Sequence, residues 1–290
     1  CSARPIRNIN KSTHFERRMN LTPQESIDKY GIHLKTEMSH PELLQESSYV
    51  LIRHGLSDFN YRALVAKTDF GEGSPEFRAV ETSTDLPDPE LHAVGVMQCE
   101  AHQEQANALK FHTVFSSPMQ RAMMTTIHMF KNHPDKANIR FIVLPIAREV
   151  LHTTNDICIN PYDLIEKFGE GKPAAHGLVF DFSRLFVYGI PELWQVFTLA
   201  NVEKQKLIIE KLKKVNAEPN HEAPQRTNYM DVMLEILPQH HPRFEDCESL
   251  IRRAAVLKDF MREYLKMNPV EGGVKHGIVC HSMIIATMTQ

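Results

Sequence analysis

Four short apolar runs constrain the fold of this chain more than any other feature of its sequence. They are residues 49–52, 113–115, 139–144 and 277–280. None alternates cleanly between apolar and polar residues, so each suits a strand that is covered on both faces, as in a parallel sheet. Because helical patterns separate the runs, we expect an α/β fold: a three-layer α/β/α sandwich with a mostly parallel central sheet and a large helical insertion.

The remaining sequence sets the expected boundaries of domains and elements. Helical patterns cover residues 95–109, 120–130, 202–215 and 247–265. We expect residues 1–46 to be an N-terminal extension and residues 47–290 to be one domain, with an insertion at about 155–245. Residues 61–90 contain several glycines and prolines, which predict a loop.

Composition narrows the class of protein. The net charge is −3, so there is no overall attraction to nucleic acid or to an anionic membrane. No apolar run approaches the roughly 20 residues of a transmembrane helix. The five cysteines are scattered without metal-site spacing, which favours free thiols and a cytoplasmic location. Residues 1–18 hold five basic residues and one acidic residue, which resembles the tail of a transit sequence and makes a mitochondrial location the alternative.

Polar residues follow the apolar runs at the points where a parallel sheet binds ligands. In open α/β sheets, ligands bind beyond the carboxyl ends of the strands. The first run ends in Arg53 and His54, the second in residues 116–117 and the fourth in residues 281–282, while the third leads to Glu149. We therefore expect these residues to meet at one edge of the sheet.

A helix start follows the second run. Ser117 suits the N-cap, Pro118 the first helical position and Gln120 the third, which makes a capping box and places Arg121 in the first turn. A helix N-terminus favours anions and an arginine adds a forked donor, so the pattern indicates a phosphate clamp. The alternative is an arginine paired with a surface carboxylate.

The other strand ends offer groups for catalysis. A neutral imidazole such as His54 can act as a nucleophile, and Gly55 would allow a sharp turn and a close approach of ligand. His281 could orient that imidazole, and a shielded Glu149 could act as a general acid. Taken singly, each has an ordinary structural explanation, since the chain has 16 histidines.

Four blocks of the sequence resemble, in order, the motifs of the histidine phosphatase superfamily, in its phosphoglycerate mutase-like branch. RHGLSDFN (53–60) resembles RHGxSxxN, residues 88–98 resemble DxxLTxxGxxQA, residues 114–126 resemble SSPxxRAxxTA, and residues 277–285 resemble the late strand–His motif. Residues 248–261 also resemble the helix before that last motif, whereas residues 155–245 match poorly.

The resemblance implies a role for each residue. His54 would accept the phosphoryl group as phosphohistidine, and Glu149 would be the proton donor. The phosphate pocket would be lined by His281, Arg53 and Arg121, with Ser57 and Asn60 close to it. No metal or other cofactor is implied.

The departures from the family pattern favour one activity. The ERxYGxLxG stretch of the mutases is absent around Glu149, and Ser57 stands where the acid-phosphatase branch has arginine. His92 and Ser282 replace the usual Thr and Gly without removing a catalytic group. We expect a metal-independent phosphatase that hydrolyses a phosphomonoester, with a bell-shaped pH dependence.

Alternatives remain open at this point. One is phosphoryl transfer of the phosphoglycerate mutase type, and another is a non-catalytic structural subunit of a larger assembly. The substrate could be a phosphorylated small molecule or a phosphoprotein. The sequence fixes neither the substrate nor the oligomeric state, which could be a homo-oligomer.

Overall fold

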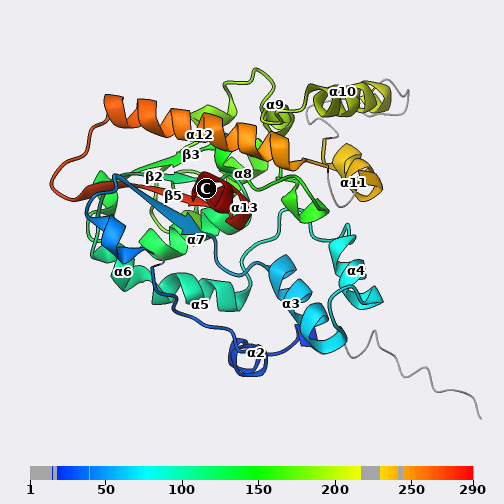
Figure 1. Cartoon of the computed structure of the whole chain (residues 1–290), viewed down its shortest axis with the longest axis horizontal. Coiled ribbons are helices and arrows are strands. Elements are labelled where there is room, and N and C mark those ends of the chain that lie inside the picture. Colours follow the sequence, from blue (N-terminus) through cyan, green and yellow to red (C-terminus); the bar gives the residue numbers. More distant parts are fainter. Residues whose placement is uncertain (1–14, 16–17, 39, 217–228, 241–243, 290) are drawn as a thin grey trace, which may run out of the picture.

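A computed structural model describes residues 15, 18–38, 40–216, 229–240 and 244–289. Five parallel strands form its centre in the order β1-β5-β2-β3-β4 (Figure 1). The strands are β1 (Tyr49–Arg53), β2 (Lys110–Ser116), β3 (Arg140–Val143), β4 (Phe180–Asp181) and β5 (Val274–Cys280). The predicted apolar runs are therefore strands, and only the two-residue β4 was too short to be seen in the sequence.

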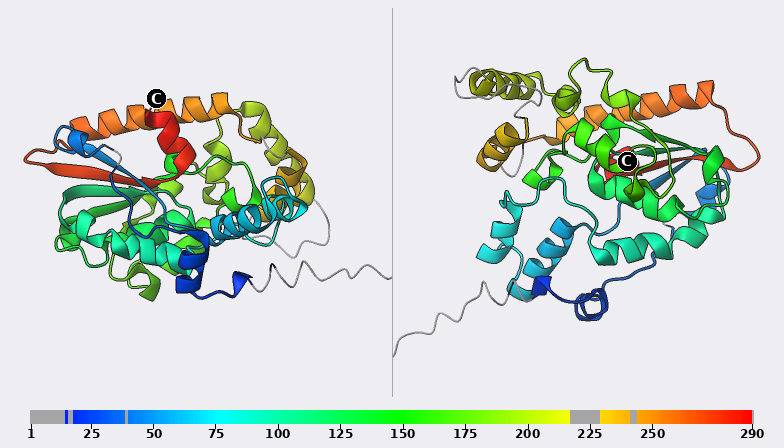
Figure 2. Two further views of the ribbon diagram at one scale, coloured as in Figure 1. Left: turned by 60° about the horizontal axis from the view of Figure 1, so that its bottom comes forward. Right: turned by 180° about the vertical axis from the view of Figure 1, so that it is seen from behind.

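Helices cover both faces of the sheet. Helices α5 (Ala93–Ala101), α6 (Gln103–Asn107) and α7 (Gln120–Phe130) lie on one face, and α12 (Cys247–Met267) and α13 (Ser282–Thr289) lie on the other (Figures 1 and 2). The strand residues Val114 and Val279 pack with the first layer, while Phe115 and Ile278 pack with the second. Neighbouring residues of a strand thus enter opposite cores, which confirms the three-layer α/β/α prediction.

The other elements extend from these layers. The remaining helices are α2 (Pro23–Tyr30), α3 (Asp58–Phe70), α4 (Pro75–Glu81), α8 (Pro161–Phe168), α9 (Trp194–Phe197), α10 (Val202–Asn216) and α11 (Tyr229–His240). Short 3-10 turns are η1 (Pro41–Leu44), η2 (Lys136–Asn138), η3 (Pro145–Ala147), η4 (Thr154–Asp156), η5 (Pro173–Ala175), η6 (Ser183–Leu185) and η7 (Pro191–Leu193). Helices α9, α10 and α11 share a third apolar cluster with Leu151 and Ile157, which ties them to the chain that follows β3.

Two predictions about local structure were wrong. Residues 61–90 are not a loop, because α3 and α4 occupy most of this stretch. Its glycines and prolines mark helix ends: Gly71 is the C-cap of α3, and Pro75 is the first residue of α4 after the N-cap Ser74. The helix predicted at 95–109 is interrupted at His102, which separates α5 from α6.

The strands bring their carboxyl ends together at the edge that faces α3, α4 and α11 (Figure 1). Arg53 of β1 pairs with Cys280 of β5, and Ser116 of β2 pairs with Val279 of β5. The residues that follow these three strands therefore emerge at the same level. Within the described ranges, no helix has the length and apolar character needed to cross a membrane.

Candidate active site

Two histidines meet where β1 and β5 end. The backbone N–H of His54 donates to the Cys280 carbonyl at 3.0 Å, so the sheet pairing continues one residue beyond β1. The His54 and His281 rings then lie with their centroids 5.0 Å apart at 60°. Both side chains are buried, His54 at 9% exposure and His281 at 0%. The sheet register alone brings together two imidazoles that are more than two hundred residues apart in the chain.

The tautomer of His54 follows from its neighbour. Its Nδ1 lies 2.7 Å from the Gly55 carbonyl oxygen. A carbonyl oxygen only accepts, so Nδ1 carries the proton and the lone pair of a neutral ring lies on Nε2. Burial lowers the pKa of His54 well below its ordinary value, and the positive charge of Arg121 lowers it further. His54 is therefore held neutral, with Nε2 available as a nucleophile.

The turn after His54 rests directly on α5. A Cβ at Gly95 would lie 2.1 Å from the Leu56 carbonyl oxygen, and one at Gly55 would lie 2.8 Å from the Gly95 oxygen. The Gly55 N–H also donates to Thr125 Oγ1 of α7 at 3.0 Å. Both glycines are needed because the two backbones touch, and this contact fixes the direction in which His54 leaves its strand.

His281 is oriented by the end of β2. Its Nε2 lies 2.8 Å from Ser117 Oγ, while its Nδ1 is buried with no hydrogen-bond partner among the described residues. Burial, Arg121 and then His54 lower the pKa of His281 well below its ordinary value. A buried imidazole nitrogen without a partner is costly, so Nδ1 is a natural contact for a ligand oxygen.

Ser117 Oγ bonds His281 and also accepts from the Met119 N–H at 3.4 Å, so Ser117 keeps part of its predicted capping role. Helix α7 begins at Gln120 with Met119 as its N-cap, so the predicted capping box was wrong. The Gln120 N–H is instead satisfied by the Asp88 carboxylate at 2.9 Å, from a distant part of the chain. Arg121 still lies in the first turn of the helix, as predicted.

Arg121 is buried, at 2% exposure, beside both histidines. Its Nη1 donates to the Asn155 carbonyl at 2.8 Å, and its Nη2 donates to Asp156 Oδ1 at 2.9 Å. The carboxylate partner is buried too, so the alternative of a surface ion pair is wrong. These two bonds aim the guanidinium and leave its other N–H groups for a ligand.

Glu149 has the electrostatics of a general acid. Burial raises the pKa of its carboxyl, and the nearby negative charge of Asp156 raises it further. Its Oε1 accepts a hydrogen bond from the Val150 N–H at 2.9 Å, which opposes part of this shift. A carboxyl that keeps its proton toward higher pH can donate it to a leaving group.

The other predicted phosphate ligands differ in their surroundings. Ser57 is the N-cap of α3, where its hydroxyl donates to Asn60 Oδ1 at 2.8 Å and accepts from the Asn60 N–H at 3.2 Å. Arg53 ends β1 with an exposed side chain. The structure thus groups the two histidines with Arg121, engages Ser57 and Asn60 with each other, and leaves Arg53 accessible. Phosphate contacts by these three residues remain predictions.

A buried ion network, which sequence reasoning missed, supports the acid side of the site. Glu245 bonds Arg148 at 2.7 and 3.1 Å and Arg253 at 3.1 Å, with all three side chains almost fully buried. Burial alone would raise the pKa of Glu245, but Arg148 and Arg253 lower it to about 2. Arg253 also donates to the Arg148 carbonyl at 2.6 Å. The network fixes the backbone immediately before Glu149.

Asp88 is a second residue whose structural role was not predicted from the sequence. Its carboxylate accepts from the Gln120 N–H and, at 3.1 Å, from the Ile159 N–H, and burial raises its pKa to about 6. Asp88 begins the second motif block, and this position in the motif was the feature of the sequence that could have indicated its role.

Within the described part of the chain, no group of three or more His, Cys, Asp or Glu side chains is arranged to hold a metal ion.

Comparison with known proteins agrees with this site over part of the chain. Residues 49–142 match the family described as histidine phosphatase superfamily (branch 1), which confirms the recognised motifs there. The matched segment contains Arg53, His54 and Arg121 but ends before Glu149 and His281. No curated protein matches the sequence.

Two solved structures are similar to the chain at low identity. They are named mycobacterial hydrolase 1 and mycobacterial hydrolase 2, and each is 15% identical over 82% of this chain. The similarity covers 75% of the first and 69% of the second, with TM-scores of 0.37 and 0.36.

Proposed function

We propose that this protein is a phosphatase that hydrolyses a phosphomonoester through a phosphohistidine on His54. The observation that carries the proposal is the bond from His54 Nδ1 to the Gly55 carbonyl at 2.7 Å, which directs a nucleophilic lone pair to Nε2. Burial and Arg121 keep that imidazole neutral, so it is ready to attack at neutral pH.

The first step forms a bond from His54 Nε2 to phosphorus as the bond from phosphorus to the alcohol oxygen breaks. Arg121 supplies positive charge at the phosphoryl oxygens, which is the main requirement of phosphoryl transfer. The buried Nδ1 of His281 is available to donate to one of these oxygens, provided that its Nε2 accepts from Ser117. Glu149, protonated, gives its proton to the departing alkoxide.

The second step releases phosphate. Water attacks phosphorus as the bond to Nε2 breaks, and the Glu149 carboxylate takes the proton that the water loses. His54 returns to its neutral tautomer, because Nδ1 stays bonded to Gly55 throughout. Each group finishes as it began, so the cycle requires only substrate and water.

The first test is hydrolysis of an aryl phosphate by the wild type and by His54→Ala. We expect the wild type to release phosphate and the variant to lose activity by a factor of about 10³ or more, because the covalent route is gone. His40→Ala, which removes an exposed histidine outside the site, should match the wild type. Equal inactivity of the wild type and His54→Ala would contradict the proposal and favour the non-catalytic alternative, whereas equal phosphate release by both would exclude His54 as the nucleophile.

A further inference from the structure

A cavity of about 470 Å³ lies between α3, α4, the segment that follows α4 and Phe15. Its lining includes Phe59, Arg62, Glu76, Val80, Asp85 and Leu86, and we call it the α3–α4 cavity. Nothing in the mechanism above uses it. None of its lining residues is a predicted catalytic group, but α3, which supplies Phe59 and Arg62, begins four residues after His54.

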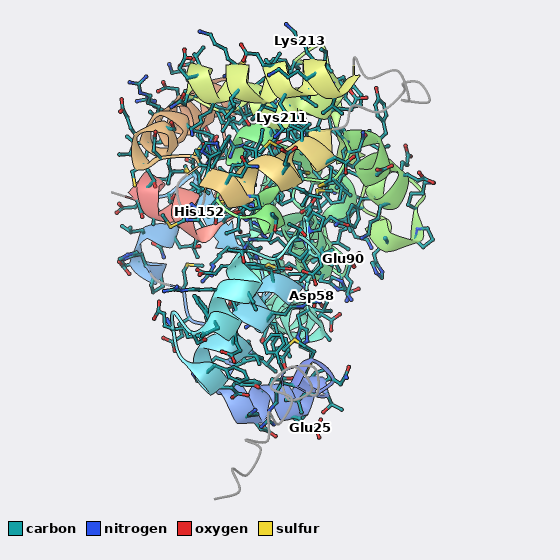
Figure 3. All side chains as sticks on the ribbon, turned by 90° about the vertical axis from the view of Figure 1, so that its right-hand side faces the viewer. Glu25, Asp58, Glu90, His152, Lys211 and Lys213 are labelled. Carbon is teal, nitrogen blue, oxygen red and sulfur yellow. The ribbon has the colours of Figure 1, made fainter. Side chains whose placement is uncertain are left out.

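Two contacts connect this cavity to the nucleophile side of the site. The Asp58 N–H donates to the Glu90 carbonyl at 3.1 Å, and Ser57 forms an isolated bridge with Leu91. Figure 3 shows Asp58 and Glu90 beside each other. The start of α3, four residues after His54, is therefore bound to the chain just beyond the segment that lines the cavity.

Two further contacts connect the same segment to Arg121 and to the acid side. Asp88 caps the first residue of α7, directly before Arg121. Thr154 Oγ1 donates to the carbonyl of Ser83, which also lines the cavity. The segment that lines one side of the cavity is thus bonded to α7, which carries Arg121, and to the loop after Glu149.

The lining of the cavity is mainly apolar. Phe59, Val80 and Leu86 supply apolar surface. Among the described lining residues, Arg62 is paired with Asp85 at 2.9 Å. An apolar group would be favoured here by its removal from water.

The size of the cavity suits a medium-sized organic group. A cavity of about 150 Å³ holds one benzene molecule. The α3–α4 cavity, at about 470 Å³, has room for an alkyl chain of several carbons or for two fused rings. A small polar metabolite would leave most of it empty.

We propose that the substrates are phosphomonoesters of apolar alcohols, whose alkyl or aryl group binds in the α3–α4 cavity while the phosphate binds at His54. This inference rests on the proposed phosphatase activity and adds the class of alcohol. The cavity acts as a specificity site and takes no part in bond breaking.

The test compares hexyl phosphate with glycerol 3-phosphate, two primary alkyl esters that differ chiefly in the polarity of the alcohol. We expect kcat/KM to be higher for hexyl phosphate by at least about tenfold, because its methylene groups leave water. In Ala79→Trp, which fills the cavity from an exposed lining position, this preference should fall to about twofold or less through a higher KM.

Controls separate this inference from the phosphatase proposal. Thr68→Trp places the same side chain at an exposed position of α3 that does not line the cavity, and should keep the preference. Ala79→Leu fills less space and should reduce the preference partly. Equal kcat/KM for the two esters, or an unchanged preference in Ala79→Trp, would overturn the inference while leaving the phosphatase intact. No phosphate release from either ester would overturn the phosphatase proposal and this inference with it.

Discussion

The nucleophile side and the acid side of the candidate site are built in different ways. His54 and His281 are positioned by strand register and by backbone contacts of Gly55 with its neighbours. Glu149 lies on a loop held by buried charges: Glu245 pairs with Arg148, directly before Glu149, and Arg121 pairs with Asp156 later in the loop. The nucleophile is thus positioned by strand pairing and close backbone packing, and the acid by buried ion pairs. The two sides should therefore respond differently to mutation and to pH.

Removing Glu245 should have the largest effect on stability. Glu245→Ala leaves two buried arginines without their carboxylate and should lower the free energy of unfolding by about 3–5 kcal/mol, measured by urea titration. Glu248→Ala removes an exposed ion pair three residues away and should change it little. Similar stability of the two variants would show that charge does not hold the acid side.

The same network predicts how stability depends on pH. The folded-state pKa of Glu245 is about 2, below its ordinary value of 4.5. The stability that ionised Glu245 gives to the fold is therefore fully present above pH 4.5 and is lost as the pH falls toward 2. Urea titrations across that range should show a smaller loss in Glu245→Gln than in the wild type.

A methyl group at Gly95 should damage the nucleophile side. Gly95→Ala places a carbon 2.1 Å from the Leu56 carbonyl, so α5 and the turn must separate. We expect a stability loss of about 1–3 kcal/mol from this overpacking. Activity should fall by about 10²-fold, since displacement of the nucleophile by about 1 Å is sufficient. Unchanged kcat/KM would contradict a role for this contact in aiming His54.

The pH profile should separate the two sides. At low pH, activity should fall as His54 becomes protonated. This limb should lie below the ordinary pKa of histidine, because burial and Arg121 lower the pKa of His54. At high pH, activity should fall as Glu149 loses its proton. This limb should lie above the ordinary pKa of glutamate, because burial raises the pKa of Glu149. In Glu149→Gln, kcat should be low and the alkaline limb absent. If Glu149→Gln kept the alkaline limb of the wild type, that limb would belong to a group other than Glu149.

The smallest effect is expected from Ser117. Ser117→Ala removes the hydroxyl that bonds His281 Nε2 and should cost about 1 kcal/mol in stability. We expect kcat to fall by about tenfold while KM changes little, because His281 loses its orientation in the transition state. Ser117→Thr keeps the hydroxyl and should recover most of the activity. No recovery would indicate a packing defect.

Sequence predicted what depends on local pattern and missed what depends on distant partners. The strands, the three layers and the first-turn position of Arg121 follow from periodicity and from residue order. The capping of α7 by Asp88 and the bond from Ser117 to His281 cannot be deduced this way, because each joins residues far apart in the chain. Helices α3 and α4 were missed because their boundary glycines and prolines outweighed a weak helical pattern.

The most direct test of the account is to trap the phosphorylated intermediate. Wild-type protein would be mixed rapidly with a ³²P-labelled phosphomonoester, quenched in alkali and digested, and the labelled peptide sequenced. The account predicts an acid-labile, alkali-stable label on His54, absent from His54→Ala and prolonged in Glu149→Gln. Release of phosphate at the normal rate without any such label, or a label on another residue, would contradict it.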